Sequence, residues 1–389
     1  MNIGIDPETR KRKQHTRTFD TLKEARAEYA RVTEQRNNGT FVHSSAITLN
    51  EWLDQWLALR SQDLEETTLY SYRVTLDRVR GRLGGIRLQE LTEEQVEEWR
   101  DWALESGRLR GPRAGTPLSV ATVEMSLGRL KEALNRAVTR RLVVMNVAEN
   151  VTIPLRARKE DRRRKVNLRP WTVPEVQDFV MGVREDRLYA PFLLSLMGLR
   201  PAEVCGLRWQ DVDLGRGIIA IANTRTMMGN RAVVEKDTKS LAGERELPLP
   251  GPVLEALRAL KHLQAKEKMA LGEAYANCGY VAVHESGEAF TGKQLRRRAY
   301  RIMEILELRR VRLYDARSSC LTFLANNGVP DHILARWAGH KNVSTTKRYY
   351  VKPGVEDLRA AAVTWDGLHG RPAGGPAAGL PPQTKGRSR

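Results

Sequence analysis

Helix starts recur along this sequence more clearly than any other local signal. A Thr followed three residues later by Glu or Gln, just before periodic apolar residues, forms a capping box, in which two side chains satisfy backbone amides at the start of a helix. The pattern occurs at four pairs of positions: Thr21 with Glu24, Thr48 with Glu51, Thr92 with Gln95, and Thr172 with Glu175. We therefore predict a mainly α-helical fold.

A four-helix domain is predicted over residues 47–153. Apolar residues recur there at spacings of three and four, which places them on one face of each helix. The second helix covers about 67–83 and the third begins at Thr92. The first and fourth helices carry the clearest stripes, namely Leu49, Trp52, Leu53, Trp56 and Leu57, and Val120, Val123, Leu127, Leu130, Leu134 and Val138.

Two segments flank this domain. Residues 1–46 combine a strand-like start at Ile3 and Ile5, a basic run from Arg10 to Arg17 and a helix near 23–35, which predicts a small β/α segment with little core. Residues 154–170 are polar and strongly basic without apolar periodicity. We predict that they form a flexible linker between domains.

A second large domain is predicted over residues 171–366. Helical patterns dominate, but 217–222, 231–235 and 246–249 are typical of three short strands of an antiparallel sheet. Residues 367–389 are mostly Gly, Pro and Ala, a composition typical of a disordered tail. The predicted fold class is mainly α with a small antiparallel β-sheet, as a helical domain followed by an α+β domain.

The charge of the chain indicates a polyanionic partner. Lys and Arg total 65 against 47 Asp and Glu, a formal net charge of +18 that is spread along the sequence. Nucleic acid and an acidic membrane surface both fit this charge, and the motifs must decide between them. No apolar run approaches the roughly 20 residues that span a bilayer, and residues 1–13 lack a secretory apolar stretch, so we expect a cytoplasmic protein.

The cysteines give no sign of a metal centre. Cys205, Cys278 and Cys320 lie far apart without CxxC spacing, which argues against a zinc site and for a reducing compartment. We interpret them as small buried apolar residues.

Four short segments carry residue types suited to phosphate chemistry. They are Gly198-Leu199-Arg200-Pro201-Ala202-Glu203, Tyr314-Asp315-Ala316-Arg317, Trp337-Ala338-Gly339-His340, and Thr345-Thr346-Lys347-Arg348-Tyr349-Tyr350. Taken together, they resemble the tyrosine recombinase family, the phage integrases. That family's active site has an Arg in a G-L-R-x-x-E segment, a Lys in a β-turn, an H-x-x-R pair, a G-H pair and a Tyr nine residues after that His. Arg200, Lys239, Arg317, His340 and Tyr349 match those positions.

The sequence departs from the family pattern at one position. Tyr314 stands where the family usually has His, and a phenol donates a hydrogen bond but titrates only near pH ~10. The motifs of the resemblance cover roughly 171–352. The helical domain is similar to the family's core-binding, SAM-like domain, and residues 1–46 are more weakly similar to its arm-site DNA-binding domain.

The chemistry of a phosphodiester explains these residue types. Two guanidinium groups, Arg200 and Arg317, would clamp the nonbridging oxygens as negative charge develops on them, with His340 as a third donor or a proton-transfer partner. Tyr349 would attack phosphorus to give a 3′-phosphotyrosine. Glu203 is expected to orient Arg200 or to support the local fold, and no metal or nucleotide cofactor is required.

Two of these assignments have rivals in the sequence. Tyr350 competes with Tyr349, and because adjacent helical residues point about 100° apart, only one of them can face the clamp. The spacing from His340 favours Tyr349. Lys239, in a turn between predicted strands, would protonate the leaving 5′-oxygen, and Lys236 is its rival.

Two basic clusters are candidate DNA-binding surfaces. One combines Lys293, Arg296, Arg297, Arg298 and Arg301 at helical spacing. The other is the start of the basic run from Arg10 to Arg17, namely Arg10, Lys11, Arg12 and Lys13. It would bind an accessory DNA site or form a disordered basic arm.

The resemblance implies a site-specific DNA recombinase of the integrase type. Its expected partners are double-stranded DNA attachment sites, three further copies of the chain in a tetramer on DNA, a host DNA-bending protein and a directionality factor, with no membrane partner. Two alternatives stay open: a chromosome-dimer or transposon resolvase with the same chemistry, and a catalytically idle DNA-binding protein on the same scaffold.

Overall fold

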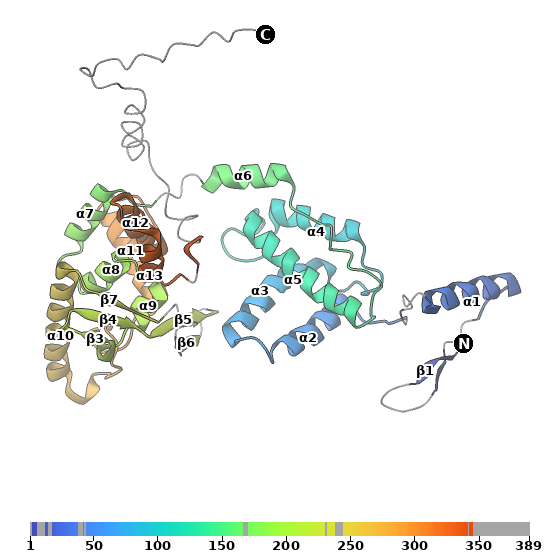
Figure 1. Ribbon diagram of the computed structural model, residues 1–389, viewed down its shortest axis with the longest axis horizontal. Coiled ribbons are helices and arrows are strands. Elements are labelled where there is room, and N and C mark those ends of the chain that lie inside the picture. Colours follow the sequence, from blue (N-terminus) through green and yellow to red (C-terminus); the bar gives the residue numbers. More distant parts are fainter. Residues whose placement is uncertain are drawn as a thin grey trace, which may run out of the picture. The chain divides into compact units, whose positions relative to one another are not determined.

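The computed structural model describes residues 2–5, 12–14, 18–37, 42, 44–165, 170–229, 232–237, 244–340 and 342–344 (Figure 1). The chain divides into two compact units, Met1–Asn167 and Leu168–Arg389, called here the first and the second unit. Both are built mainly of helices, with short antiparallel strands, which confirms the predicted fold class. Within the described residues, no helix has the length and hydropathy to span a membrane.

The first unit begins with a hairpin and a helix. Strands β1 (Asn2–Ile5) and β2 (Arg12–Gln14) pair antiparallel, and α1 spans Leu22–Asn37. The Thr21 hydroxyl accepts a hydrogen bond from the Glu24 amide at 3.2 Å, as its position before the helix predicts. Arg12 and Lys13 belong to β2, whereas Arg10 and Lys11 lie outside the described residues.

Four helices then pack around a tryptophan-rich core, in agreement with the periodicity of the sequence. They are α2 (Leu49–Arg60), α3 (Glu66–Leu83), α4 (Glu93–Ser106) and α5 (Val120–Thr139). Capping boxes begin α2 at Thr48 and α4 at Thr92. The indole N–H of the buried Trp52 donates to the Ala133 carbonyl at 3.0 Å, and that of Trp99 donates to the Arg78 carbonyl at 2.9 Å. These bonds fix the helices relative to one another.

The predicted flexible linker contains a helix, so the expectation of an irregular segment was wrong. Helix α6 spans Leu155–Lys165. It lacks an apolar stripe, but its Arg, Lys, Glu, Ala and Leu residues have high intrinsic helix propensity. Arg158 also pairs with Glu124 of α5 at 2.9 Å, and Ala157 packs against the core of the first unit. Propensity and these contacts form the helix, and periodicity alone could not reveal it.

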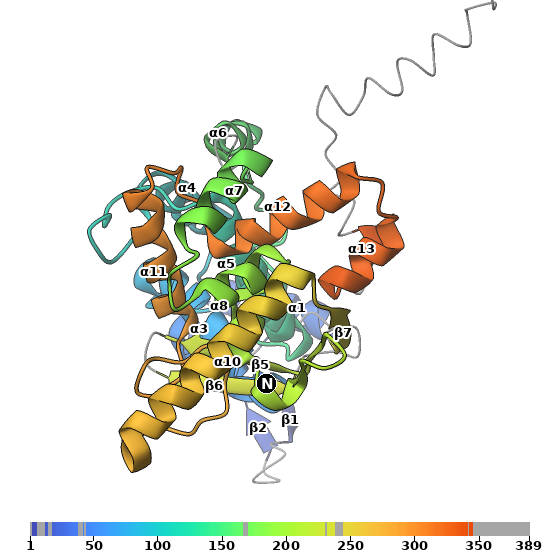
Figure 2. The same cartoon turned by 90° about the vertical axis from the view of Figure 1, so that its left-hand side faces the viewer.

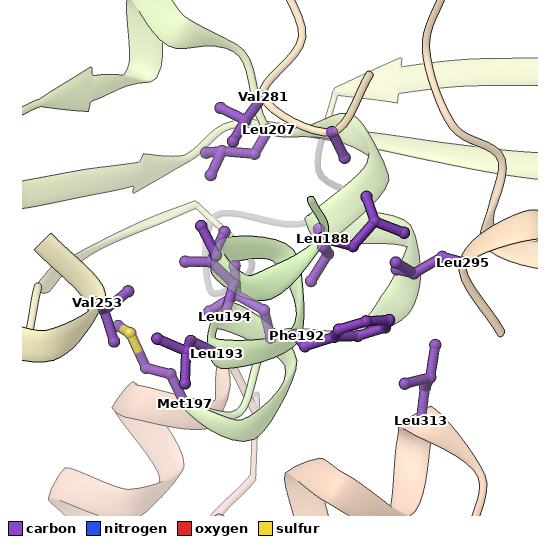
Figure 3. Close-up of a cluster of buried hydrophobic side chains, with 14 of the residues drawn as sticks. Leu188, Phe192, Leu193, Leu194, Met197, Leu207, Val253, Val281, Leu295 and Leu313 are labelled. Carbon is purple, nitrogen blue, oxygen red and sulfur yellow. The ribbon is translucent and has the colours of Figure 1, made fainter. Parts of the chain in front are cut away.

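The second unit surrounds a buried helix. Helix α8 (Tyr189–Leu196) is apolar on every side, and α10 (Gly251–Leu271) and α12 (Leu313–Asn326) flank it (Figure 2). Side chains from Leu188 to Met197 meet Leu207, Val253, Val281, Leu295 and Leu313 from the surrounding segments (Figure 3). The remaining helices are α7 (Val173–Gly182), α9 (Pro201–Gly206), α11 (Gly292–Ile305) and α13 (Asp331–Ala338), with short 3₁₀ turns at Trp209–Asp211 and Gly272–Ala274.

The strands of the second unit form two small antiparallel sheets, whereas the sequence predicted one sheet of three strands. Strands β3 (Val212–Asp213), β4 (Ile218–Ile221) and β7 (Arg245–Pro248) form one sheet in that order, and β5 (Asn223–Met228) pairs with β6 (Ala232–Asp237). The predicted strands correspond to β4, β6 and β7. Strand β5 was missed because it is largely polar, and β3 because it has two residues.

Gly206 allows α9 to lie directly on strand β5. A Cβ atom at this position would fall 2.8 to 2.9 Å from backbone atoms of Asn223, Thr224 and Arg225. Only a glycine tolerates so close an approach of two backbones. The helix that follows Arg200 is therefore held against a strand.

The cysteines match their predicted role only in part. Cys205 is buried and Cys320 is half-buried, but Cys278 is exposed. Within the described residues, no cluster of three or more His, Cys, Asp and Glu side chains could hold a metal ion.

Candidate active site

The turn between α8 and α9 positions Arg200. The chain leaves α8 through Gly198, whose φ of 109° a glycine adopts without strain, and Pro201 then starts α9 with Arg200 as its N-cap. The Glu203 carboxylate accepts the Arg200 backbone N–H at 2.8 Å and its guanidinium at 2.6 Å. A second guanidinium nitrogen donates to the Gly339 carbonyl at 3.1 Å. Arg200 thus joins the start of α9 to the end of α13.

Arg317 lies at the centre of the same region and is fully buried. From α12 its guanidinium donates to the carbonyls of Gly198, at 2.7 Å, and Ala338. It also lies 2.9 Å from the His340 Nε2 atom. The two arginines singled out in the sequence are therefore brought together with His340, 140 residues after Arg200 in the chain.

His340 follows α13 after a left-handed turn at Gly339, whose φ is 62°. Burial and the positive charges of Arg317, Arg200 and Arg245 lower the pKa of its ring to about 4. The imidazole is thus neutral at neutral pH. Because a guanidinium only donates hydrogen bonds, Nε2 accepts from Arg317, and the ring proton is on Nδ1.

A third arginine, Arg245, belongs to this cluster and was not predicted. Its side chain is 2% exposed and donates to both oxygens of Glu203, at 3.2 and 3.1 Å, and to the Trp337 carbonyl at 2.8 Å. Burial disfavours ionisation of Glu203, but the hydrogen bonds and charge of Arg245, with the charge of Arg200, outweigh burial and lower its pKa. The available signal was the alternation of β7, which places Arg245 and Leu247 on the buried face.

These five residues, Arg200, Glu203, Arg245, Arg317 and His340, are called the arginine site. Three guanidinium charges and one carboxylate leave a net charge of +2 (3 − 1) around a neutral imidazole. The protein's own carbonyls and carboxylate hold each guanidinium in place. Such an arrangement is prepared to stabilise an anion, because little reorganisation is required when negative charge develops.

Tyr314 lies one helical turn before Arg317 and is 44% exposed. It lines a pocket of about 380 Å³ with Pro201 and Ala202, the residues next to Arg200. Basic side chains complete the wall of this pocket: Arg225, Lys293, Arg296 and Arg312. An exposed phenol and four cations therefore lie beside the arginine site.

The basic cluster on α11 divides between two surfaces. Lys293 and Arg296 line the pocket beside Tyr314. Arg298 instead pairs with Asp186 at 2.6 Å, and Arg297 is exposed. Helical spacing therefore separates residues that are adjacent in the sequence.

Several predicted site residues lie outside the described part of the chain. They are Lys239, Tyr349 and Tyr350, and the side chain of Lys236 on β6 is likewise not described. Their roles stay predictions. The described chain approaches Tyr349 closely in sequence, since Ser344 is five residues before it.

Two protein-family models match the chain. The phage integrase family matches residues 183–353, which contain the whole arginine site, and the phage integrase N-terminal SAM-like domain matches residues 48–102. Among curated relatives, a tyrosine recombinase XerC-like protein of Caldanaerobacter subterraneus subsp. tengcongensis is 23% identical over 345 residues, which is 85% of each chain. An integrase of Streptomyces ambofaciens is 25% identical over 386 residues, 97% of this chain and 93% of the relative.

Solved structures show the same fold. The Tn1549 transposon integrase in complex with transposon right end DNA aligns with a TM-score of 0.65 at 18% identity, over 82% of this chain and 99% of that one. A lambda integrase dimer bound to a COC′ core site aligns with a TM-score of 0.55 at 16% identity, over 79% and 97%.

A helical unit, a second unit with a preorganised arginine site and these matches together define an enzyme that breaks and rejoins DNA strands. The chain belongs to the tyrosine recombinase family, the phage integrases, as the sequence motifs indicated.

Proposed function

We propose that this recombinase integrates and excises a phage or other mobile element at specific DNA sites, by means of a 3′-phosphotyrosine formed on Tyr349. The observation that carries the proposal is the arginine site, in which Arg200, Arg317 and His340 converge although they come from three separate segments. Two relatives named integrase, which align with 97% and 82% of this chain, support the same biological role.

The first step exchanges one phosphate ester for another. The Tyr349 oxygen attacks phosphorus, the bond from phosphorus to the 5′-oxygen breaks, and the DNA 3′-phosphate becomes joined to the tyrosine. We assign the Lys239 ammonium as the group that protonates the departing 5′-oxygen. In the second step a 5′-hydroxyl from the partner strand attacks the same phosphorus and releases Tyr349.

The arginine site stabilises the charge that develops during both steps. Arg200, 31% exposed, is the more accessible clamp residue. Arg317 is fully buried, so its direct contact with phosphate requires a phosphate oxygen to replace one of its carbonyl partners. The neutral His340 then offers its Nδ1 proton as a donor, and Glu203 and Arg245 position Arg200.

We assign Tyr314 as a further hydrogen-bond donor to the phosphate. It takes the position of the usual family histidine and is exposed beside Arg200, as contact with a substrate requires. The Tyr314 hydroxyl would donate this hydrogen bond to a phosphate oxygen.

The proposed partners follow from strand exchange. Two duplex attachment sites require four active centres, hence four copies of the chain, and a lambda integrase tetramer bound to a Holliday junction has the same fold. Lys293 and Arg296 are proposed to contact the DNA of the core site, and Arg10, Lys11, Arg12 and Lys13 to contact an outlying site. We further propose that a host DNA-bending protein and a directionality factor are partners of the reaction. The reaction would take place in the bacterial cytoplasm.

A suicide DNA substrate tests the nucleophile. Its nick lets the 5′-end diffuse away after cleavage, so the covalent complex accumulates and is counted on a denaturing gel. We expect Tyr349→Phe to abolish capture because it removes the attacking oxygen, and Tyr350→Phe to retain most of it. Capture that is lost in Tyr350→Phe and kept in Tyr349→Phe would reverse the assignment.

One observation favours a second candidate, a catalytically idle DNA-binding protein. Tyr314 replaces a histidine that the family usually carries, and loss of such a residue is one route to an inactive scaffold. The same assay decides, because an idle protein binds the substrate without forming the covalent complex. The resolvase alternative shares the chemistry, and the basic segment before residue 46 favours the integrase.

A further inference from the structure

Three consecutive backbone carbonyls at the end of α13 each accept a hydrogen bond from a different arginine of the arginine site. Carbonyls at the C-terminal end of a helix have no partner within the helix, so other groups must satisfy them. The pairs are Trp337 with Arg245, Ala338 with Arg317, and Gly339 with Arg200. Cations suit this end because the helix dipole makes it negative. A displacement of α13 would therefore disturb all three arginines at once.

Helix α13 needs contacts outside itself to keep its position. It has eight residues, and isolated helices shorter than ~12–15 residues are marginal in water. It packs on α12 and β7 (Figure 2). The arginines are not a constant support, because in the proposed reaction Arg317 exchanges one carbonyl for a phosphate oxygen. A contact that does not involve the phosphate clamp would hold the helix in place throughout the reaction.

The side chain of Trp337 provides such a contact. Its indole N–H donates to the Met197 carbonyl at 2.8 Å. Met197 directly follows α8, at the start of the turn that leads to Arg200. The half-buried indole ring also packs both against the main core of the second unit and against the small cluster that α12 and α13 form between them. Trp337 thus joins α13 to the body of the second unit.

The turn that receives the indole also holds Arg317. The carbonyl of Gly198, the residue after Met197, accepts from Arg317 at 2.7 Å. The ring lies against this backbone, since a Cβ atom at Gly198 would be 3.5 Å from the indole Nε1 atom. The Cys320 thiol also donates to the Met197 carbonyl, at 3.3 Å, but it belongs to α12 and does not attach α13 to the turn.

We propose that Trp337 is a positioning residue for strand cleavage. Its bond to Met197 fixes the end of α13 against the turn between α8 and α9, and so keeps the three carbonyls aligned with the three arginines. Trp337 acts through these groups and not on the phosphate, because the single donor of its ring is already bonded to Met197. The inference rests on the proposed function, since cleavage is the reaction that the arginine site would serve.

Two substitutions separate the hydrogen bond from the packing of the ring. Trp337→Phe removes the donor and keeps an apolar aromatic ring, whereas Trp337→His keeps a ring N–H but loses more of the packing. Single-turnover cleavage of a suicide substrate is measured with saturating protein. We expect Trp337→Phe to slow cleavage about 2- to 10-fold, the range that one ordinary hydrogen bond supplies, without a change in DNA affinity. Trp337→His should cleave faster than Trp337→Phe.

Trp209→Phe is the matched control. Trp209 is half-buried and packs against the same core, and its indole N–H donates at 2.8 Å to Gln264, which is not part of the arginine site. This variant should cleave at the wild-type rate. Equal rates in Trp337→Phe and Trp209→Phe would overturn the inference. Slower cleavage by Trp337→His than by Trp337→Phe would also overturn it, because packing alone predicts that order.

The titration of His340 tests the inference without DNA. Burial and the charges of the three arginines lower its pKa to about 4, and the charge of Glu203 acts in the opposite direction. If Trp337→Phe releases the end of α13, the imidazole gains water and moves away from the arginines, so its pKa should rise from about 4 toward 6.5. NMR of the ring protons, assigned by comparison with His340→Asn, measures this change.

This second measurement separates failure of the inference from failure of the proposed function. An unchanged His340 pKa in Trp337→Phe would overturn the inference at any rate of cleavage. A wild-type protein that forms no covalent complex with the suicide substrate would instead count against the proposed function.

Discussion

The two units hold their arginines in opposite ways. In the arginine site of the second unit, Arg245 and Arg317 are buried and donate to carbonyls and to Glu203 of the protein itself. In the first unit, a pocket of about 810 Å³ between α3, the loop after α4 and the start of α5 is lined by Arg108 and Arg110, for which no ion pair is found among the described residues. The comparison teaches that one set of arginines is held in place by acceptors of the protein itself, whereas the other set is not held by ion pairs. Variants in the two sets should therefore fail differently.

The largest effect is expected at Arg317. Arg317→Lys keeps the charge but loses the planar fork that joins Gly198, Ala338 and His340. We predict that single-turnover cleavage slows about 10²- to 10³-fold, as for loss of one preorganised donor, while DNA affinity changes little. Arg309→Lys is the control, since Arg309 pairs with Glu175 outside the arginine site. A loss of affinity as large as the loss of rate would erase the contrast between the two units.

The next effect concerns the stability of the arginine site. Arg245→Met leaves the Glu203 carboxylate buried without its main partner, which should lower the free energy of unfolding by roughly 3–5 kcal/mol. Urea unfolding followed by circular dichroism measures this change. Adding Glu203→Gln should recover part of the loss, because a neutral amide costs less to bury than a charge. Equal urea midpoints of unfolding for wild type and Arg245→Met would mean that the ion pair between Arg245 and Glu203 does not stabilise the fold.

The smallest effect is expected from the titration of His340. Its pKa of about 4 in the folded chain lies below the unfolded value near ~6.5, so between these values the unfolded chain binds more protons. The contribution of His340 to stability is therefore complete above pH ~6.5 and is lost as the pH falls toward 4.

Subtraction isolates this contribution from the carboxylates that titrate in the same range. Unfolding free energies of wild type and His340→Asn are measured from pH 4 to 8, and their difference should change between pH 4 and 6.5 and be flat above it. A difference that changes between pH 7 and 8 instead would show that the imidazole is not held neutral by the surrounding arginines.

Local signals predicted most of the helical framework. The hydroxyl residues at 48, 92 and 172 cap helices as expected, because a capping box depends only on residues three apart in the chain. Helix α6 was not predicted from local patterns, since its contacts with Glu124 and with the core of the first unit involve residues outside the helix. Strand β5 was not predicted either, because it is defined by pairing with β6 and lacks apolar alternation.

The candidate site was predictable only where motifs marked it. Arg200, Arg317 and His340 stood in recognisable segments, but Arg245 stands in an ordinary-looking strand of Arg, Glu, Leu and Pro. Its importance comes from Glu203, 42 residues earlier in the chain, and from the Trp337 carbonyl 92 residues later. Pairings over such distances are a property of the fold, and local sequence patterns do not carry them.

The most direct test of the central claim is to identify the residue that carries the DNA. A covalent complex trapped on a suicide substrate is digested with nuclease and trypsin, which should release a peptide covering residues 349–359, because Pro353 protects the bond after Lys352. Fragmentation by mass spectrometry then distinguishes the two adjacent tyrosines. We predict that Tyr349 carries a nucleotide joined to its oxygen through the 3′-phosphate. Its presence on Tyr350, or a wild-type protein that binds DNA without forming any adduct, would contradict the account.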